Sequence, residues 1–175
     1  MKKLFTLTLL LSLFLSLEAK EVATQQPIFN ITDTQGKHYT MTGTDNGLIV
    51  QGMEDKIIFL EFFGHRCPPC LATIPHLVKL QKKYKEKLAI IAVEVQGYNN
   101  AQLQKFVQKK GMNYIVVADE NSANLVNYIS QRAQWKGSIP FMLALDTKGA
   151  VQFIQVGMIP EASLEELVHQ LSVKK

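Results

Sequence analysis

The chain has 175 residues, of which 47% are hydrophobic and 19% are charged, so it is long and apolar enough to form one folded domain. This composition argues against an intrinsically disordered protein, whose chains are much poorer in apolar residues. The net charge is +4, but the Lys and Arg residues are spread out, and no dense basic block with interleaved aromatics occurs. A nucleic-acid-binding protein is therefore not expected.

The N-terminus has the features of a secretory signal peptide. Lys2 and Lys3 precede an uncharged apolar stretch over residues 4–17, which is short for a membrane span but suits the core of a signal peptide. We expect cleavage after Ala19, so that residues 1–19 are the signal peptide, with an uncleaved membrane anchor as the alternative. A polar linker over 20–26 then leads into an exported domain, in the periplasm or otherwise outside the cytosol.

The first folded segments are predicted to be strands. Residues 28–41 (IFNITDTQGKHYTM) indicate a β-hairpin whose turn lies at 33–36, where Gly36 can adopt a positive φ. A loop rich in turn residues separates this hairpin from a short strand at 48–52. Residues 56–63 (KIIFLEFF) form a continuous apolar run with β-branched and aromatic residues, which predicts a central strand covered on both faces.

The remaining chain alternates helical and strand patterns. Apolar residues recur at helical spacing from Pro68 to about Lys87, opposite a Lys-rich face. The later elements are predicted, in chain order, as a strand at 88–95, a helix at 101–111 stopped by Gly111, a strand at 114–118, a helix at 122–133 with Ser122 as N-cap, two strands within 141–156 joined by a turn at 146–149, and a helix at 160–175. This alternation predicts an α/β fold with a mixed central sheet flanked by helices, and the extra N-terminal hairpin would cover one edge or end of the sheet.

The only two cysteines, Cys67 and Cys70, stand where the central strand gives way to a helix. A disulfide at this spacing closes too small a loop to stabilise a fold, so a redox function is expected. The helix dipole and the free N–H groups of the first turn should lower the pKa of the Cys67 thiol. We expect Cys67 to attack a disulfide and the more buried Cys70 to resolve the mixed disulfide.

Metal and haem sites are less well supported by this pattern. Zinc would need further ligands, and covalent haem would need a histidine at position 71, which is Leu71. Copper held by the two cysteines and a histidine stays open, as does a thiol peroxidase that uses Cys67. We expect no metal and no cofactor beyond the redox-active disulfide Cys67–Cys70.

The segments FLEFFGHRCPPC, Pro75, GSIPF at 137–141 and LALDTKGAV resemble the thioredoxin superfamily. With the hairpin and the signal peptide, the chain is most similar to the exported TlpA/ResA/CcmG-type thiol:disulfide oxidoreductases, over residues 28–172. The resemblance implies a thioredoxin-like domain over 27–175.

The resemblance also implies roles for individual residues. Cys67 and Cys70 match the attacking and resolving cysteines, and Glu61 matches a buried acid. A desolvated carboxyl has a raised pKa and can exchange a proton with Cys70 through water. Pro140 matches a cis-proline that faces the disulfide, and a cis bond there would let the backbone of Ile139 pair with an extended client segment. Pro75 matches a proline that kinks the active-site helix.

Some residues depart from the family pattern or allow two interpretations. Arg66 replaces the usual tryptophan before the first cysteine, and Arg66 and His65 are candidate substrate-binding residues that could also tune the thiolate, with a plain surface position as the alternative. Glu94 is interpreted as a solvated strand end rather than as a second active-site acid. For Trp135, core packing is favoured over a place in a substrate groove.

These observations predict an exported thiol:disulfide oxidoreductase that exchanges its dithiol with protein cysteines. The resemblance implies the reducing direction, including a role in cytochrome c maturation that keeps apocytochrome c thiols free. A membrane thiol-disulfide carrier would supply the electrons, and we expect a monomer. The alternatives are a disulfide oxidase or isomerase, whose reduction potential would be higher, and a copper-carrying assembly factor.

Overall fold

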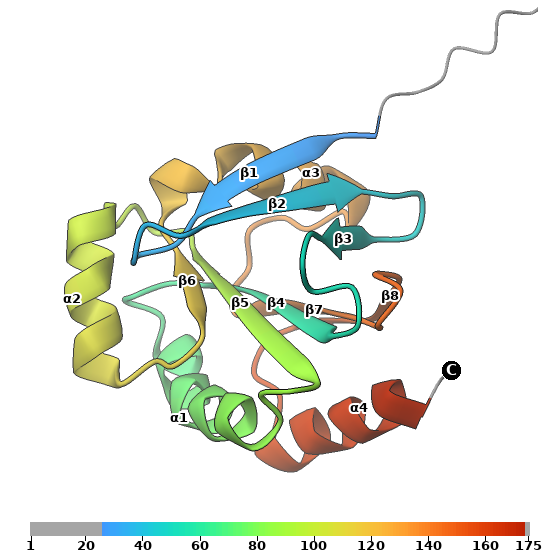
Figure 1. The fold of residues 1–175 in the computed structure, drawn as a ribbon. Helices are drawn as coiled ribbons and strands as arrows, with labels where there is room; N and C mark the ends of the chain where they lie inside the picture. Colours follow the sequence, from blue (N-terminus) through green and yellow to red (C-terminus); the bar gives the residue numbers. More distant parts are fainter. Residues whose placement is uncertain (1–25, 174–175) are drawn as a thin grey trace, which may run out of the picture.

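The computed structural model describes residues 26–173, which form two β-sheets and four α-helices (Figure 1). The predicted signal peptide, 1–19, and almost all of the linker at 20–26 lie outside the described residues, so the expectations about cleavage and anchoring stay predictions. Within 26–173, no helix has the length and apolar character needed to cross a membrane.

The central sheet has five strands in the order β6-β5-β4-β7-β8. They are β4 (Ile57–Phe63), β5 (Leu88–Glu94), β6 (Ile115–Val117), β7 (Phe141–Leu145) and β8 (Val151–Val156). Strand β4 runs parallel to β5 and antiparallel to β7, which confirms the predicted mixed sheet. Every residue of β4 and β5 is buried, as their continuous apolar runs indicate.

Helices cover both faces of this sheet. On one face, α1 (Pro68–Lys83) and α4 (Glu161–Val173) share a core with α2 (Asn100–Lys110), which lies beside the β6 edge (Figure 1). On the other face lies α3 (Ala123–Arg132). Helix α1 is shorter than predicted, because the chain leaves the helix at Tyr84 and turns into β5.

The predicted hairpin is confirmed and gains a third strand. Strands β1 (Ile28–Thr32), β2 (His38–Gly43) and β3 (Leu48–Val50) form a separate antiparallel sheet. The expectation that it covers only an edge or end is wrong, because its apolar side packs with β4, β5 and α3 in one core and so covers a face. Isolated bridges, Asp33 with Val117 and Gly47 with Ala150, connect this sheet to β6 and to the β7–β8 turn.

Local signals at two helix ends had different outcomes. Gly111 ends α2 in the left-handed region, with φ of 63°, as predicted. Ser122 does precede α3 but makes no capping hydrogen bond with it. Its hydroxyl donates to the carbonyl of Asp119, because a short 3-10 turn, η1 (Asp119–Asn121), comes directly before the helix.

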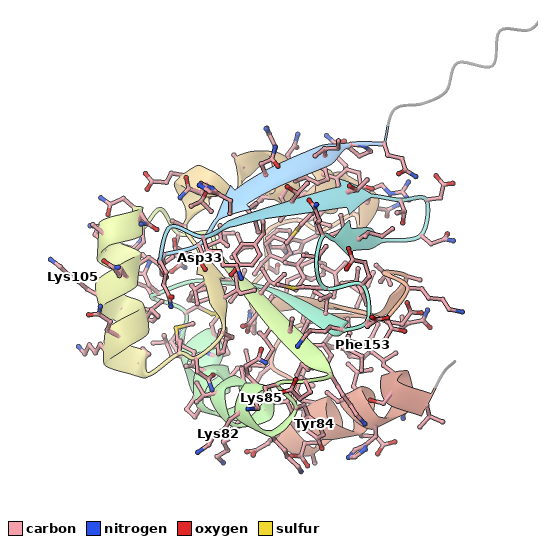
Figure 2. The ribbon with its side chains drawn as sticks, viewed as in Figure 1. Asp33, Lys82, Tyr84, Lys85, Lys105 and Phe153 are labelled. Carbon is pink, nitrogen blue, oxygen red and sulfur yellow. A yellow bond between two sulfur atoms is a disulfide. The ribbon has the colours of Figure 1, made fainter. Side chains whose placement is uncertain are left out.

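The positive charges are distributed over the surface. Lys105 projects outward from α2, whereas Lys82 and Lys85 lie together at the C-terminal end of α1 (Figure 2). Between α1 and α4, Lys79 pairs with Glu161 at 3.3 Å and Lys83 with Glu165 at 3.0 Å. Such exposed pairs contribute little to stability, so the contact between these helices depends mainly on their buried apolar faces.

Candidate active site

The two cysteines form a disulfide at the start of α1, the helix that follows β4 in the chain. Cys67 is the N-cap residue, and its sulfur accepts the backbone N–H of Cys70 at 3.3 Å. Cys67 is 7% exposed and Cys70 is 1% exposed, which confirms that Cys70 is the more buried of the two. The arrangement leaves Cys67 as the sulfur that a second protein can reach.

Two prolines determine which backbone N–H groups lie near the Cys67 sulfur. Pro68 and Pro69 fill the first two positions of α1 and have no N–H group, so the amide of Cys70 is the first that the helix offers. That amide points at Cys67, and the first turn holds no acidic residue. After reduction, both the amide and the helix dipole favour the Cys67 thiolate, so the prediction of a lowered pKa has a physical basis in this geometry.

Glu61 lies behind the disulfide on the α1 side of the sheet. Side chains alternate along a strand, and its neighbours Phe59 and Phe63 belong to the same core as both cysteines. Glu61 is 2% exposed, and burial raises its pKa to about 8. Its carboxyl therefore mostly holds its proton at neutral pH and loses it at slightly higher pH. This suits the predicted exchange of a proton with Cys70.

Tyr114, which precedes β6, is a second buried polar group in this core. Its pKa is raised well above the ordinary value, mainly by burial and secondly by the charge of Glu61. The tyrosine hydroxyl has no hydrogen-bond partner among the described residues. Sequence reasoning missed Tyr114, because a tyrosine beside an apolar strand carries no signal that separates it from ordinary core.

The loop before β7 approaches the disulfide from the other side. The Ile139–Pro140 bond is cis, as the resemblance implied, and the Ile139 carbonyl oxygen lies 3.8 Å from the Cys67 sulfur. Ile139 is partly exposed and Pro140 is buried. The backbone predicted to pair with a client thus lies next to the Cys67 sulfur, while the pairing and the attacking role of Cys67 stay predictions.

Trp135 holds this loop in place. Its ring stacks on Phe141 with centroids 4.8 Å apart, and its indole N–H donates to the carbonyl of Ser138 at 2.7 Å. The residue is 7% exposed, so core packing is confirmed over a place in an open groove.

Arg66 and His65 differ in how far they reach solvent. Arg66 is exposed directly before Cys67, as a client-contacting cation must be. The side chain of His65 is 9% exposed, and its Nδ1 lies 2.8 Å from Glu94. Glu94 itself is fully buried, so its interpretation as a solvated strand end is wrong: the loops after β4 and β5 cover it.

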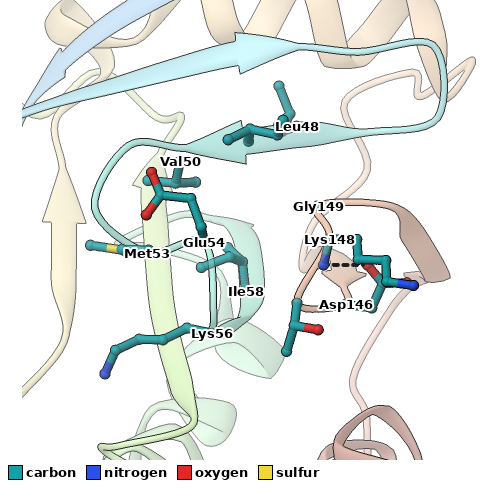
Figure 3. Close-up of a pocket in the computed structure, with 11 residues that line it drawn as sticks. Leu48, Val50, Met53, Glu54, Lys56, Ile58, Asp146, Lys148 and Gly149 are labelled. Atoms are coloured by element: carbon teal, nitrogen blue, oxygen red, sulfur yellow. Dashed lines mark hydrogen bonds between the residues drawn. The ribbon is translucent and has the colours of Figure 1, made fainter. Parts of the chain in front are cut away.

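Other predicted features lie apart from the disulfide or outside its chemistry. Pro75 is inside α1 and exposed, and its kinking role stays a prediction. A hollow of about 100 Å³ lies between β3 and the β7–β8 turn, where the backbone N–H of Lys148 donates to Asp146 at 2.9 Å (Figure 3). The residues around it include no predicted site residue. Within 26–173, no group of three or more His, Cys, Asp or Glu side chains is arranged to hold a metal ion.

Sequence comparisons find relatives among thioredoxin-like proteins and thiol-disulfide oxidoreductases. The sequence model of the AhpC/TSA family matches residues 22–154. The chain is 26% identical over 166 residues to the thiol-disulfide oxidoreductase ResA of Bacillus thuringiensis, covering 94% of this chain and 87% of that protein. It is 28% identical over 129 residues to the thioredoxin-like protein YneN of Bacillus subtilis, covering 73% and 71%.

A solved structure supports the fold. A thiol:disulfide interchange protein of the thioredoxin family from Chlorobium tepidum superposes with a TM-score of 0.66 at 21% identity, covering 85% of this chain and 96% of that one. At this identity the likeness concerns the fold alone.

Proposed function

The chain belongs to the AhpC/TSA family, and we propose that it is an exported thiol-disulfide oxidoreductase that reduces disulfides in client proteins. The observation that carries the proposal is the position of Cys67. Its sulfur caps α1, accepts the Cys70 amide, lies beside the Ile139 carbonyl and is bonded to a deeply buried partner.

The geometry supports a two-step exchange. The Cys67 thiolate attacks one sulfur of the client disulfide, a mixed disulfide forms, and the other client sulfur leaves as a thiolate. Cys70 then loses its proton and attacks the Cys67 sulfur, which re-forms Cys67–Cys70 and releases the second client thiolate. Two electrons pass from the dithiol to the client disulfide. Because the pKa of Glu61 is about 8, a fraction of its carboxyl is ionised near neutral pH, and this ionised form takes the proton of Cys70 and returns it in the reverse step.

The direction of electron flow is tested by the reduction potential. We propose the reducing direction because of the resemblance to the TlpA/ResA/CcmG-type proteins. A thiolate stabilised by the helix and by Arg66 would favour the reduced form and raise the potential, so the electrostatics of Cys67 alone do not give the direction. A value near about −270 mV supports a reductase, whereas one near about −120 mV would make the protein a disulfide oxidase.

The proposed clients are cysteine-containing proteins outside the cytosol. The exposed cation of Arg66 favours acidic client segments around the disulfide, and the partly exposed Ile139 offers backbone for pairing. The paired thiols of apocytochrome c are the first client to test, as the resemblance implies. Oxidised protein would be recharged by a membrane thiol-disulfide carrier.

Two cysteine variants test this function. Cys67→Ser should abolish the reduction of insulin disulfides, because the buried Cys70 cannot reach a client. Cys70→Ser should accumulate mixed disulfides with clients, which mass spectrometry can identify from non-reducing gels. Cys67→Ser is the matched control for trapping, and it should trap nothing. Insulin reduction that persists in Cys67→Ser, or equal trapping by both variants, would contradict the assignment.

A further inference from the structure

The carboxylate of Glu94, at the end of β5, gathers four hydrogen bonds without any exposure to solvent. Its Oε1 accepts from the backbone N–H of His65 at 3.4 Å and of Gln96 at 3.0 Å, and it lies 2.8 Å from Nδ1 of the His65 ring. Its Oε2 accepts from the backbone of Tyr98 at 3.0 Å. An ionised carboxylate can only accept, so this set of donors fits the charged form and places the shared proton on Nδ1.

The same segment also holds the residues on either side of His65. The Gln96 side chain accepts the backbone N–H of Arg66 at 2.9 Å. It also covers Gly64 so closely that a Cβ there would come within 2.2 Å of it. The Tyr98 ring stacks on the His65 ring with centroids 3.5 Å apart. Each of residues 64–66, directly before Cys67, is therefore in contact with the segment 94–98.

The charge of Glu94 acts beyond its hydrogen-bond partners. The titratable side chains that interact with it are His65, from the loop after β4, and Asp119, from η1. The pKa of Asp119 is raised first by burial and then by the charge of Glu94. The backbone N–H of His65 lies 3.4 Å from the carboxylate, and two residues span at most about 7 Å of chain, so the backbone nitrogen of Cys67 lies within roughly 11 Å of it.

We propose that Glu94 is a positioning residue of the redox site: through His65 it fixes the loop before Cys67, and its buried charge sets how readily Cys67 forms a thiolate. The Nδ1–H group of His65 points at the carboxylate and its dipole offsets part of that charge, so the two residues act on Cys67 in opposite directions. The inference rests on the proposed function only in giving Cys67 the attacking role. It gives a role to an acid at a fully buried strand end that is bound to the loop preceding Cys67.

Variants of Glu94 and His65 can distinguish an effect of the Glu94 charge on the Cys67 thiolate from the loss of contacts that hold the loop before Cys67. Glu94→Gln removes a negative charge, so the Cys67 thiolate should form at a pH lower by about one unit, for a charge about 10 Å away in protein. His65→Leu leaves the carboxylate without its ring partner, so the thiolate should form at higher pH. A residue that only supports the loop would move both variants in the same direction.

The measurement is the pH profile of Cys67 alkylation by iodoacetamide, with Cys70→Ser in every protein so that one thiol reacts. The thiolate forms a carbon–sulfur bond and iodide leaves, so the rate reports the thiolate fraction. Gln96→Leu should keep the wild-type midpoint but lower insulin turnover in the intact dithiol protein, because it releases Arg66 without a change in charge. Glu86→Gln, an equal change in charge at an exposed site, is the control and should alter neither.

Opposite shifts for the two variants support the proposal. Shifts in the same direction, or shifts in both below about 0.2 pH units, overturn it. If Glu94→Gln does not fold, the upward shift in His65→Leu and the unchanged midpoint in Gln96→Leu still decide the question. Failure of the wild-type protein to reduce insulin would refute the proposed function and would leave the alkylation result standing.

Discussion

Replacing Glu61 with Gln should change how the stability of the oxidised protein depends on pH. The pKa of Glu61 is raised from 4.5 to about 8 because the side chain is buried. Between these values the unfolded chain has lost the proton and the folded protein keeps it, so each rise of one pH unit disfavours the folded state. The stabilisation is complete below pH 4.5 and is lost as the pH rises to about 8.

The magnitude follows from the size of this pKa difference. One unit corresponds to about 1.4 kcal/mol, so the wild-type protein should lose about 3 kcal/mol between pH 5 and pH 7 through this residue. An amide does not titrate, so Glu61→Gln lacks this loss. The cost of burying the amide is the same at every pH and does not affect the slope.

Urea unfolding of both oxidised proteins at pH 5, 6, 7 and 8 measures the effect. The free energy of unfolding of Glu61→Gln, relative to wild type, should rise by about 3 kcal/mol from pH 5 to pH 7. Contributions from other titrating groups cancel in the difference. The exposed Glu86→Gln variant should stay parallel to wild type, and parallel curves for Glu61→Gln as well would refute the raised pKa.

Two further changes probe the same core. Glu61→Gln should slow insulin reduction near neutral pH more than it alters the reduction potential, because it removes the proton acceptor for Cys70; an unchanged rate would remove the relay role. Tyr114→Phe should raise the free energy of unfolding by about 1 kcal/mol, since it deletes a buried hydroxyl without a partner. A loss of stability in urea unfolding would show that the hydroxyl does have a partner.

Several residues near the cysteines have surroundings that only the tertiary structure reveals. Glu94 interrupts an apolar strand, and its position in the sequence allows either solvent or protein around it. Only the packing of two loops, which start about 30 residues apart, decides that it is buried and bound to His65. In the same way, the contact of Cys67 with Ile139 joins residues 72 positions apart.

The sequence by itself determined the elements and the chemistry that depend on neighbours along the chain. These are the two buried central strands, the left-handed glycine that ends α2, and a cysteine pair at a helix start, all of which follow from local periodicity and backbone preference. The tertiary structure alone decided that the N-terminal strands cover a face, that Tyr114 lies in the core with Glu61, and that Glu94 is buried and in contact with His65. Burial and charge coupling are set by segments that meet only in three dimensions, so no local pattern encodes them.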